Sequence, residues 1–62
     1  MYSVLASYSA VEKAELSIRQ GDAIEVLRLG SDGWWYARDV MTQQEGWVPA
    51  SYLEPLTYNH SA

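Results

Sequence analysis

The side chains that could carry acid–base or nucleophilic chemistry are few in this sequence and poorly placed for it. The one histidine, His60, is the third residue from the end. A general base must lie within hydrogen-bond reach of its proton, and a frayed terminal segment cannot hold a side chain there. Eight acidic side chains are present, but a chain of 62 residues offers no deep cleft to exclude water around a pair of them. We therefore expect no enzymatic activity and no catalytic residue.

Metal and cofactor sites are also unexpected. The sequence has no cysteine, which excludes a disulfide framework and a thiolate zinc site. It has no glycine-rich phosphate loop that leads into a helix. A chain of this length buries only about 60% of its unfolded surface, so it makes one small domain and cannot wrap a cofactor. We expect no cofactor and no metal.

Charge limits the partners. The formal net charge is −4, and the four basic residues are well separated along the chain. Nucleic-acid binding needs clustered Lys and Arg, and anionic membranes repel an acidic surface. No run of about 20 apolar residues and no signal peptide is visible. We expect a cytoplasmic monomer that binds neither nucleic acid nor membrane and favours a basic ligand.

Aromatic residues are the strongest chemical signal. Eight Tyr and Trp residues occur without a single Phe. Tyr and Trp carry a polar tip on a large apolar body, which suits half-exposed binding surfaces. The pattern therefore favours a binding module.

The elements that must position these rings are short strands. Residues 16–18 alternate between apolar and polar, residues 23–27 and 34–40 are typical of strands, and residues 46–48 form a third such segment that Pro49 ends. Residues 20–22 and 29–33 are turn-like, and residues 41–44 fit a hairpin connection without an Asn-Gly signal. This spacing favours a small all-β barrel. The predicted core is Val4, Leu16, Ile18, Ile24, Val26, Ala37, Val48 and Leu53.

Five segments in this order resemble the SH3 domain family. The segments are Val4–Tyr8, Glu15–Ile18, Gly21-Asp22, Gly33–Arg38 and Gly46–Leu53. The resemblance covers about residues 2 to 56, and it is most like SH3 domains of phagocyte-oxidase organiser-type adaptors and of Rho-family exchange factors. It implies a five-stranded barrel of two orthogonally packed antiparallel sheets with a short 3-10 turn. We expect a domain at residues 1–56, followed by a frayed tail at 57–62, because the tail has no periodicity.

The resemblance further implies a groove for proline-rich PxxP segments in the polyproline II conformation, with a flanking Arg or Lys. Carried over by position, Tyr8, Trp34, Pro49 and Tyr52 hold the prolines, with Trp47 beside them. The indole N–H of Trp34 is expected to donate to a ligand carbonyl. Adjacent residues of a strand point to opposite faces, so we expect Trp35 to serve in sheet packing.

Acidic residues flank Trp34 in the same resemblance. Glu12, Glu15 and Asp32 lie on the loops where the family binds a ligand Arg or Lys. Two positions depart from the family pattern: Ala6 replaces the first groove tyrosine, and Ser7 replaces an aspartate. The first proline pocket is therefore expected to lack one wall.

Two other interpretations use the same rings. An aromatic cage could hold a methylated lysine through cation–π attraction, or the Trp surface could dock against another domain of the same chain. The proline-binding interpretation predicts a ligand segment in another protein or in the parent chain. It also predicts that the domain is part of a larger signalling adaptor or exchange factor. A cage clusters its rings around a point, whereas the matched positions follow a stripe.

Overall fold

The described part of the chain, residues 1–56 of a computed structural model, contains five strands and one 3-10 turn. The elements are β1 (Tyr2–Val4), β2 (Ala23–Leu29), β3 (Trp34–Asp39), β4 (Glu45–Pro49), η1 (Ala50–Tyr52) and β5 (Leu53–Pro55). In residues 1–56 no helix is long and apolar enough to cross a membrane. The tail predicted at 57–62, which includes His60, lies outside the described residues.

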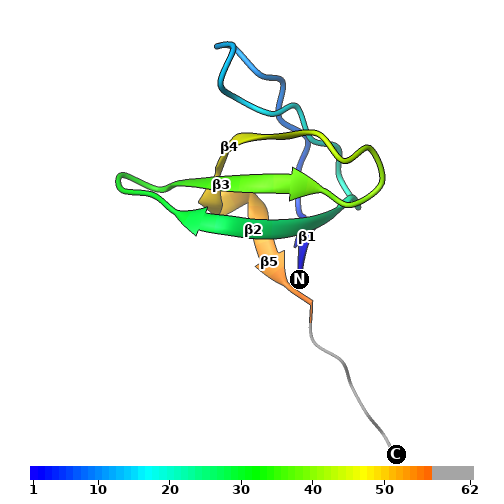
Figure 1. The fold of residues 1–62 in the computed structure, drawn as a ribbon. Coiled ribbons are helices and arrows are strands. Elements are labelled where there is room, and N and C mark those ends of the chain that lie inside the picture. Colours follow the sequence, from blue (N-terminus) through cyan, green and yellow to red (C-terminus); the bar gives the residue numbers. More distant parts are fainter. Residues whose placement is uncertain (57–62) are drawn as a thin grey trace, which may run out of the picture.

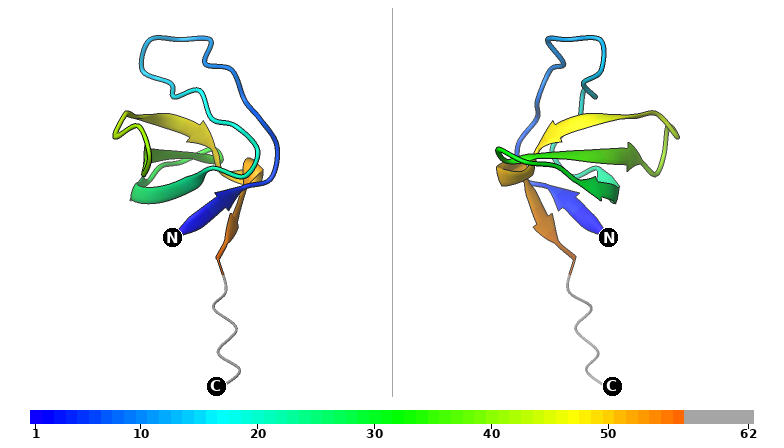
Figure 2. Two further views of the ribbon diagram at one scale, coloured as in Figure 1. Left: turned by 90° about the vertical axis from the view of Figure 1, so that its right-hand side faces the viewer. Right: turned by 60° about the vertical axis from the view of Figure 1, so that its left-hand side comes forward.

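The strands form one continuous antiparallel sheet in the order β4-β3-β2-β1-β5. Figure 1 shows β2, β3 and β4 as one layer, with β1 and β5 running away from it at a steep angle. Figure 2 shows the same two directions from other sides. β2 pairs with both β3 and β1, so it joins the two halves of the predicted orthogonal arrangement. The all-β fold class is confirmed.

β2 is two residues longer than the sequence predicted. Its pairing with β3 shifts between Val26 and Arg28, which leaves Leu27 as an extra residue. Such a β-bulge bends a strand without ending it, and the ladder continues to the Leu29–Trp35 pair. The alternating pattern predicted that the strand ends at Leu27, because a bulge interrupts the alternation.

The connection between β3 and β4 is closed by a side chain. Oδ1 of the buried Asp39 accepts hydrogen bonds from the backbone N–H groups of Met41 at 2.9 Å and Thr42 at 3.3 Å. Gln43 adopts a left-handed backbone conformation with φ of 66°. The predicted hairpin therefore forms without Asn-Gly, because the carboxylate of Asp39 satisfies the turn amides.

Residues 5–22 form a long loop that rises above the layer of β2, β3 and β4 (Figure 1). Its two sides share one isolated β-bridge, between Tyr8 and Ile18, and Glu15 forms another with Trp47 of β4. Leu16 and Ile18 are buried while Ser17 is exposed, as their alternation predicted. The alternation thus marks which side chains face the core, although no regular strand forms there.

Gly46 allows the long loop to lie against β4. A Cβ added at Gly46 would fall 2.9 Å from the carbonyl carbon of Glu15 and 2.9 Å from the nitrogen of Leu16. The N–H of Trp47 donates to the carbonyl of Ala14 at 2.9 Å, and the N–H of Leu16 donates to the carbonyl of Trp47 at 3.0 Å. These contacts fix the loop residues Ala14–Leu16 beside Trp47.

Seven of the eight predicted core residues are buried, which confirms the prediction for them. Those buried are Val4, Leu16, Ile18, Ile24, Ala37, Val48 and Leu53. Val26 is only partly buried and packs against this core from beside the bulge. Tyr2, Tyr8, Trp35 and Tyr52 pack against the core in the same way. Aromatic bodies therefore support the core at its margins.

Candidate functional site

Three aromatic side chains form a row on the surface between the long loop and η1. The ring of Tyr8 meets the ring of Tyr52 with centroids 5.8 Å apart, and it also meets Trp34 at 5.9 Å. Both contacts are edge-to-face, the geometry that aromatic pairs prefer. Pro49 of β4 lies opposite Trp34 in the strand register. We call Tyr52, Tyr8, Trp34 and Pro49 the aromatic stripe.

The two adjacent tryptophans of β3 face opposite ways, as the sequence predicted. Trp34 contacts Tyr8 in the aromatic stripe. Trp35 packs against the core and meets Tyr2 of β1 with ring centroids 5.5 Å apart. One tryptophan therefore belongs to the surface and the other to the sheet packing.

A cavity of about 340 Å³ opens at the Trp34 end of the stripe. It is lined by Glu12, Ala14, Glu15, Ser31, Trp34 and Trp47. Gly30 makes room for the indole of Trp47, because a Cβ there would fall 2.5 Å from its Cζ3 atom. Two indoles and two carboxylates thus surround one hollow, an environment that suits a planar cation such as a guanidinium.

Glu15 is held in place from two sides. Its Oε1 accepts a hydrogen bond of 2.6 Å from the hydroxyl of Tyr8 and one of 2.9 Å from the N–H of Val11. The bond from Tyr8, followed by the bond from Val11, lowers the pKa of Glu15 below its ordinary value. The same bond to Glu15, together with desolvation, raises the pKa of Tyr8 to about 12. Glu15 therefore stays ionised, and neither bond uses its Oε2.

The other two predicted acids differ in position. Glu12 lines the cavity with an exposed side chain. Asp32 is exposed and does not line it. Asp32 has φ of 59° and precedes Gly33 at 80°, a turn geometry that Asp tolerates better than most residues. Its role in ligand binding stays a prediction.

Two lining residues were not predicted from the sequence. Ala14 and Ser31 contribute small side chains that leave the hollow open. No sequence signal separates such residues from ordinary loop positions. Strand alternation, in contrast, could have placed Tyr36 on the face of Trp34, because the two are separated by one residue.

At the opposite end of the stripe, Ala6 is exposed. The neighbouring Leu5 donates its N–H to the carbonyl of Tyr52 at 2.7 Å, so this part of the chain lies beside η1. A methyl group stands here where the family resemblance leads one to expect a ring. The stripe therefore ends at Tyr52 and Tyr8.

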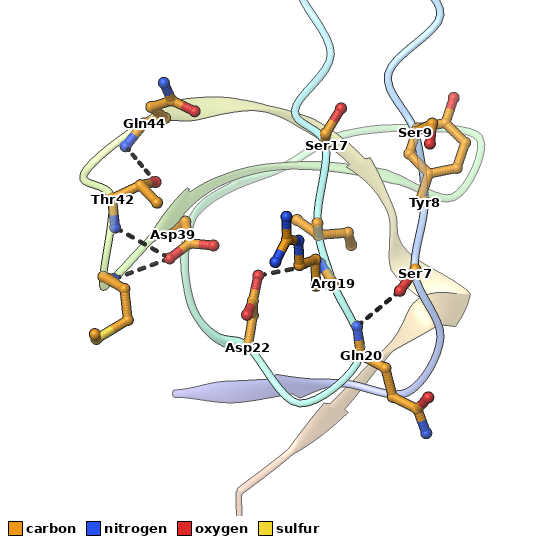
Figure 3. Close-up of a pocket in the computed structure, with 12 residues that line it drawn as sticks. Ser7, Tyr8, Ser9, Ser17, Arg19, Gln20, Asp22, Asp39, Thr42 and Gln44 are labelled. Carbon is orange, nitrogen blue, oxygen red and sulfur yellow. Dashed lines mark hydrogen bonds between the residues drawn. The ribbon is translucent and has the colours of Figure 1, made fainter.

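A larger hollow of about 820 Å³ lies elsewhere, between the base of the long loop and the β3–β4 connection (Figure 3). Some of its polar groups are engaged in loop structure. The hydroxyl oxygen of Ser7 accepts from the N–H of Gln20 at 3.0 Å, and Oδ2 of Asp22 accepts from the N–H of Arg19 at 3.1 Å. Among residues 1–56, Tyr8 is the only aromatic residue that lines it. We assign this hollow to the packing of the loops.

Comparison with known proteins identifies the family. A family model described as the SH3 domain matches residues 3–50. The chain is 38% identical over 53 residues to SH3 and PX domain-containing protein 2A of Mus musculus, covering 86% of this chain and 4% of that protein. It is 44% identical over 52 residues to the guanine nucleotide exchange factor DBS of Homo sapiens, covering 84% of this chain and 5% of that protein.

A solved structure gives the same answer. The C-terminal SH3 domain of Myosin IB from Entamoeba histolytica, bound to EhFP10(GEF) peptide, superposes with a TM-score of 0.80 and 33% identity. The match covers 98% of this chain and 88% of that chain. The chain therefore belongs to the SH3 domain family, whose members dock proline-rich segments in aromatic-lined grooves. It spans only about 4–5% of the length of the two curated relatives named above.

Proposed function

We propose that this domain binds a proline-rich segment through the aromatic stripe and a flanking Arg or Lys through the neighbouring cavity. The observation that carries the proposal is the continuity of the two. Trp34 contacts Tyr8 in the stripe and also lines the cavity beside Glu12 and Glu15. One extended ligand can therefore contact both.

The stripe has the properties that a polyproline II ligand requires. Such a ligand is already extended, has three residues per turn and loses little conformational entropy on docking. Its ridges of proline rings fit between parallel aromatic ridges. The row of Tyr52, Tyr8 and Trp34 supplies these ridges, and the indole N–H of Trp34 is the proposed donor to a ligand carbonyl.

The cavity supplies the charge. Glu15 is ionised and oriented before a ligand arrives, because Tyr8 and Val11 both donate to its Oε1. A guanidinium can then donate to Oε2 and to Glu12 while it stacks on an indole face. Asp32 contributes at longer range in this proposal.

An aromatic cage for methylated lysine is less well supported. Tyr8 contacts both Tyr52 and Trp34, but no contact between the rings of Tyr52 and Trp34 is found among residues 1–56, so the three rings do not close on one another as a cage would. Docking of the Trp surface against a neighbouring domain of the same chain is also less well supported, because the similar SH3 domain of Myosin IB is bound to a peptide.

The parent protein is part of the proposal. The two named curated relatives are much longer than this chain. We propose that the domain acts without catalytic activity inside a larger cytoplasmic signalling adaptor or exchange factor. Its ligand is a proline-rich segment of another protein or of that parent.

Substitution of the two adjacent tryptophans tests the proposal. Trp34→Ala should weaken binding of a basic PxxP peptide at least about 30-fold, as expected for an aromatic hot spot of roughly 2 kcal/mol, with little change in the unfolding temperature. Trp35→Ala is the matched control. It should destabilise the fold and, at a temperature where it is still folded, bind the peptide nearly as well as wild type. Unchanged peptide affinity in folded Trp34→Ala would overturn the proposal.

A further inference from the structure

The outer face of β2, β3 and β4 carries three rows of side chains, set by the strand register. In the first row Trp34 lies opposite Pro49 and belongs to the aromatic stripe. In the second, Tyr36 lies between Arg28 of β2 and Trp47 of β4. In the third, Arg38 lies between Glu25 and Glu45. Residues directly opposite one another in a ladder share a face, so the rows lie side by side.

The second row is continuous with the cavity through Trp47. The indole of Trp47 lines the cavity and also meets the ring of Tyr36 edge-to-face, with centroids 5.3 Å apart. Tyr36 is half-buried, so part of its surface is open to solvent. The aromatic surface therefore does not stop at the cavity but passes it and continues down the sheet.

Charge distinguishes the second row from the third. Arg38 pairs with Glu25 at 2.6 Å and with Glu45 at 3.6 Å, which neutralises the third row. Arg38 is the only basic residue with an ion pair among residues 1–56. Arg28 is exposed beside Tyr36 and has no carboxylate partner in that part of the chain. A positive charge thus lies next to a half-buried aromatic ring in the second row.

The opposite end of the site lacks a contact. Ala6 is exposed and carries only a methyl group, and the neighbouring Leu5 is hydrogen-bonded to the carbonyl of Tyr52. A ligand therefore finds fewer aromatic contacts at the proline end of the stripe, and it finds additional ones past the cavity. The aromatic contact surface is therefore smaller at the Ala6 end of the site and larger at the Tyr36 end.

We propose that ligand residues past the basic residue, on the side away from the prolines, bind the second row. An apolar ligand side chain lies against Tyr36 and Trp47, and a ligand carboxylate pairs with Arg28. The inference rests on the proposed function and adds the class of ligand: a PxxP segment whose basic end continues into an apolar and then an acidic residue. Neighbouring rows are two strand residues apart, about 6.6 Å, which two or three residues of an extended ligand span.

Two families of synthetic peptides test this inference. The core peptide contains an Arg and a PxxP motif and ends in neutral glycine–serine residues past the Arg. The extended peptides carry Leu followed by Asp, beginning one, two or three residues past the Arg. Calorimetry on the folded domain should show that the best extended peptide binds about fivefold more tightly than the core peptide, the size expected for an aromatic contact and an exposed ion pair.

Variants of the domain assign this gain to the second row. Tyr36→Ala should reduce the gain to less than about twofold while leaving the affinity for the core peptide nearly unchanged. Arg28→Gln should lower the gain in affinity by as much as replacement of the peptide Asp with Asn does, because each change removes one partner of the same ion pair. Arg19→Gln is the matched control, because it makes the same charge change at an exposed residue of the other hollow (Figure 3) and should leave the gain intact.

The outcomes separate this inference from the proposed function. A core peptide that binds, with no extended peptide binding more tightly, overturns the inference alone. Equal loss of both peptides in Tyr36→Ala also overturns it. If that variant does not fold, Arg28→Gln and the Asp-to-Asn peptide decide the matter. A core peptide that does not bind at all overturns the proposed function, and this inference with it.

Discussion

The hydroxyl of Tyr8 donates a hydrogen bond of 2.6 Å to Oε1 of Glu15, seven residues further along the chain. This bond crosses the long loop and joins the aromatic stripe to the acidic cavity. Tyr8 thereby has two roles: its ring contacts both Tyr52 and Trp34, and its hydroxyl orients the carboxylate. The surface for prolines and the site for a cation are therefore built as one unit.

The bond predicts a late tyrosine titration. The pKa of Tyr8 is raised from 10.0 to about 12, chiefly by the hydrogen bond to Glu15. Because the folded-state value is above the unfolded one, the stability that Tyr8 contributes is complete below about pH 10 and is lost as pH rises toward about 12. Tyrosinate absorbance should show one residue that titrates last, and this step should be absent in Tyr8→Phe.

Glu15→Gln is the companion variant for that titration. The amide carries no charge and can donate to the phenolate, so the late step should move toward pH 10. A late step that persists unchanged in Glu15→Gln would show that burial alone raises the pKa of Tyr8.

Salt and the charge of Glu15 should both affect ligand binding. Exposed charges act mainly on encounter and register, and salt screens them beyond about 8 Å at physiological ionic strength. Affinity for a basic PxxP peptide should therefore fall as salt rises, and Glu15→Gln should weaken binding and flatten the salt dependence.

The pKa of Glu15 lies below its ordinary 4.5. Binding of the basic peptide should therefore persist as pH falls to about 4.5 and decline only below that pH. Peptide titrations across salt and pH measure both effects, and indifference to salt and to Glu15→Gln would make the acidic loops a solubilising surface only.

A ring placed at position 6 should strengthen proline binding. Ala6 is exposed at the end of the stripe, so Ala6→Tyr should fold without a clash in the core. The new ring should tighten a simple PxxP peptide by about 0.5–1.5 kcal/mol, the usual value of an aromatic pair. Calorimetry with one peptide on both proteins measures the change. No gain in a folded variant would mean that ligands bypass this pocket and rely on Trp34 and the cavity.

Sequence patterns predicted the parts of the fold that depend on alternation. Ile24 and Val48 are buried and the two adjacent tryptophans diverge, because strand geometry sends successive side chains to opposite faces. The bulge at Leu27 was missed, since an extra residue breaks the same alternation. The hairpin forms without its usual turn signal because Asp39, a strand residue, satisfies the turn amides.

The cavity was less accessible to sequence reasoning. Its acidic residues followed from the family resemblance, but its shape depends on close approaches that no local pattern encodes. Gly30 admits the indole of Trp47, and Gly46 admits the backbone of the long loop. The position of Arg28 beside Tyr36 likewise depends on the register that follows the bulge.

Chemical-shift mapping on the labelled domain directly tests whether the aromatic stripe binds proline. Three peptides are compared: a basic PxxP peptide, the same peptide with its prolines replaced by alanine, and a trimethyl-lysine peptide without proline. Proline binding by the aromatic stripe predicts saturable shifts with the first peptide only, at the indole N–H of Trp34 and the amides of Tyr8, Glu15 and Tyr52, with Trp35 unaffected. Equal shifts with the alanine peptide, or strong shifts with the trimethyl-lysine peptide alone, would contradict it.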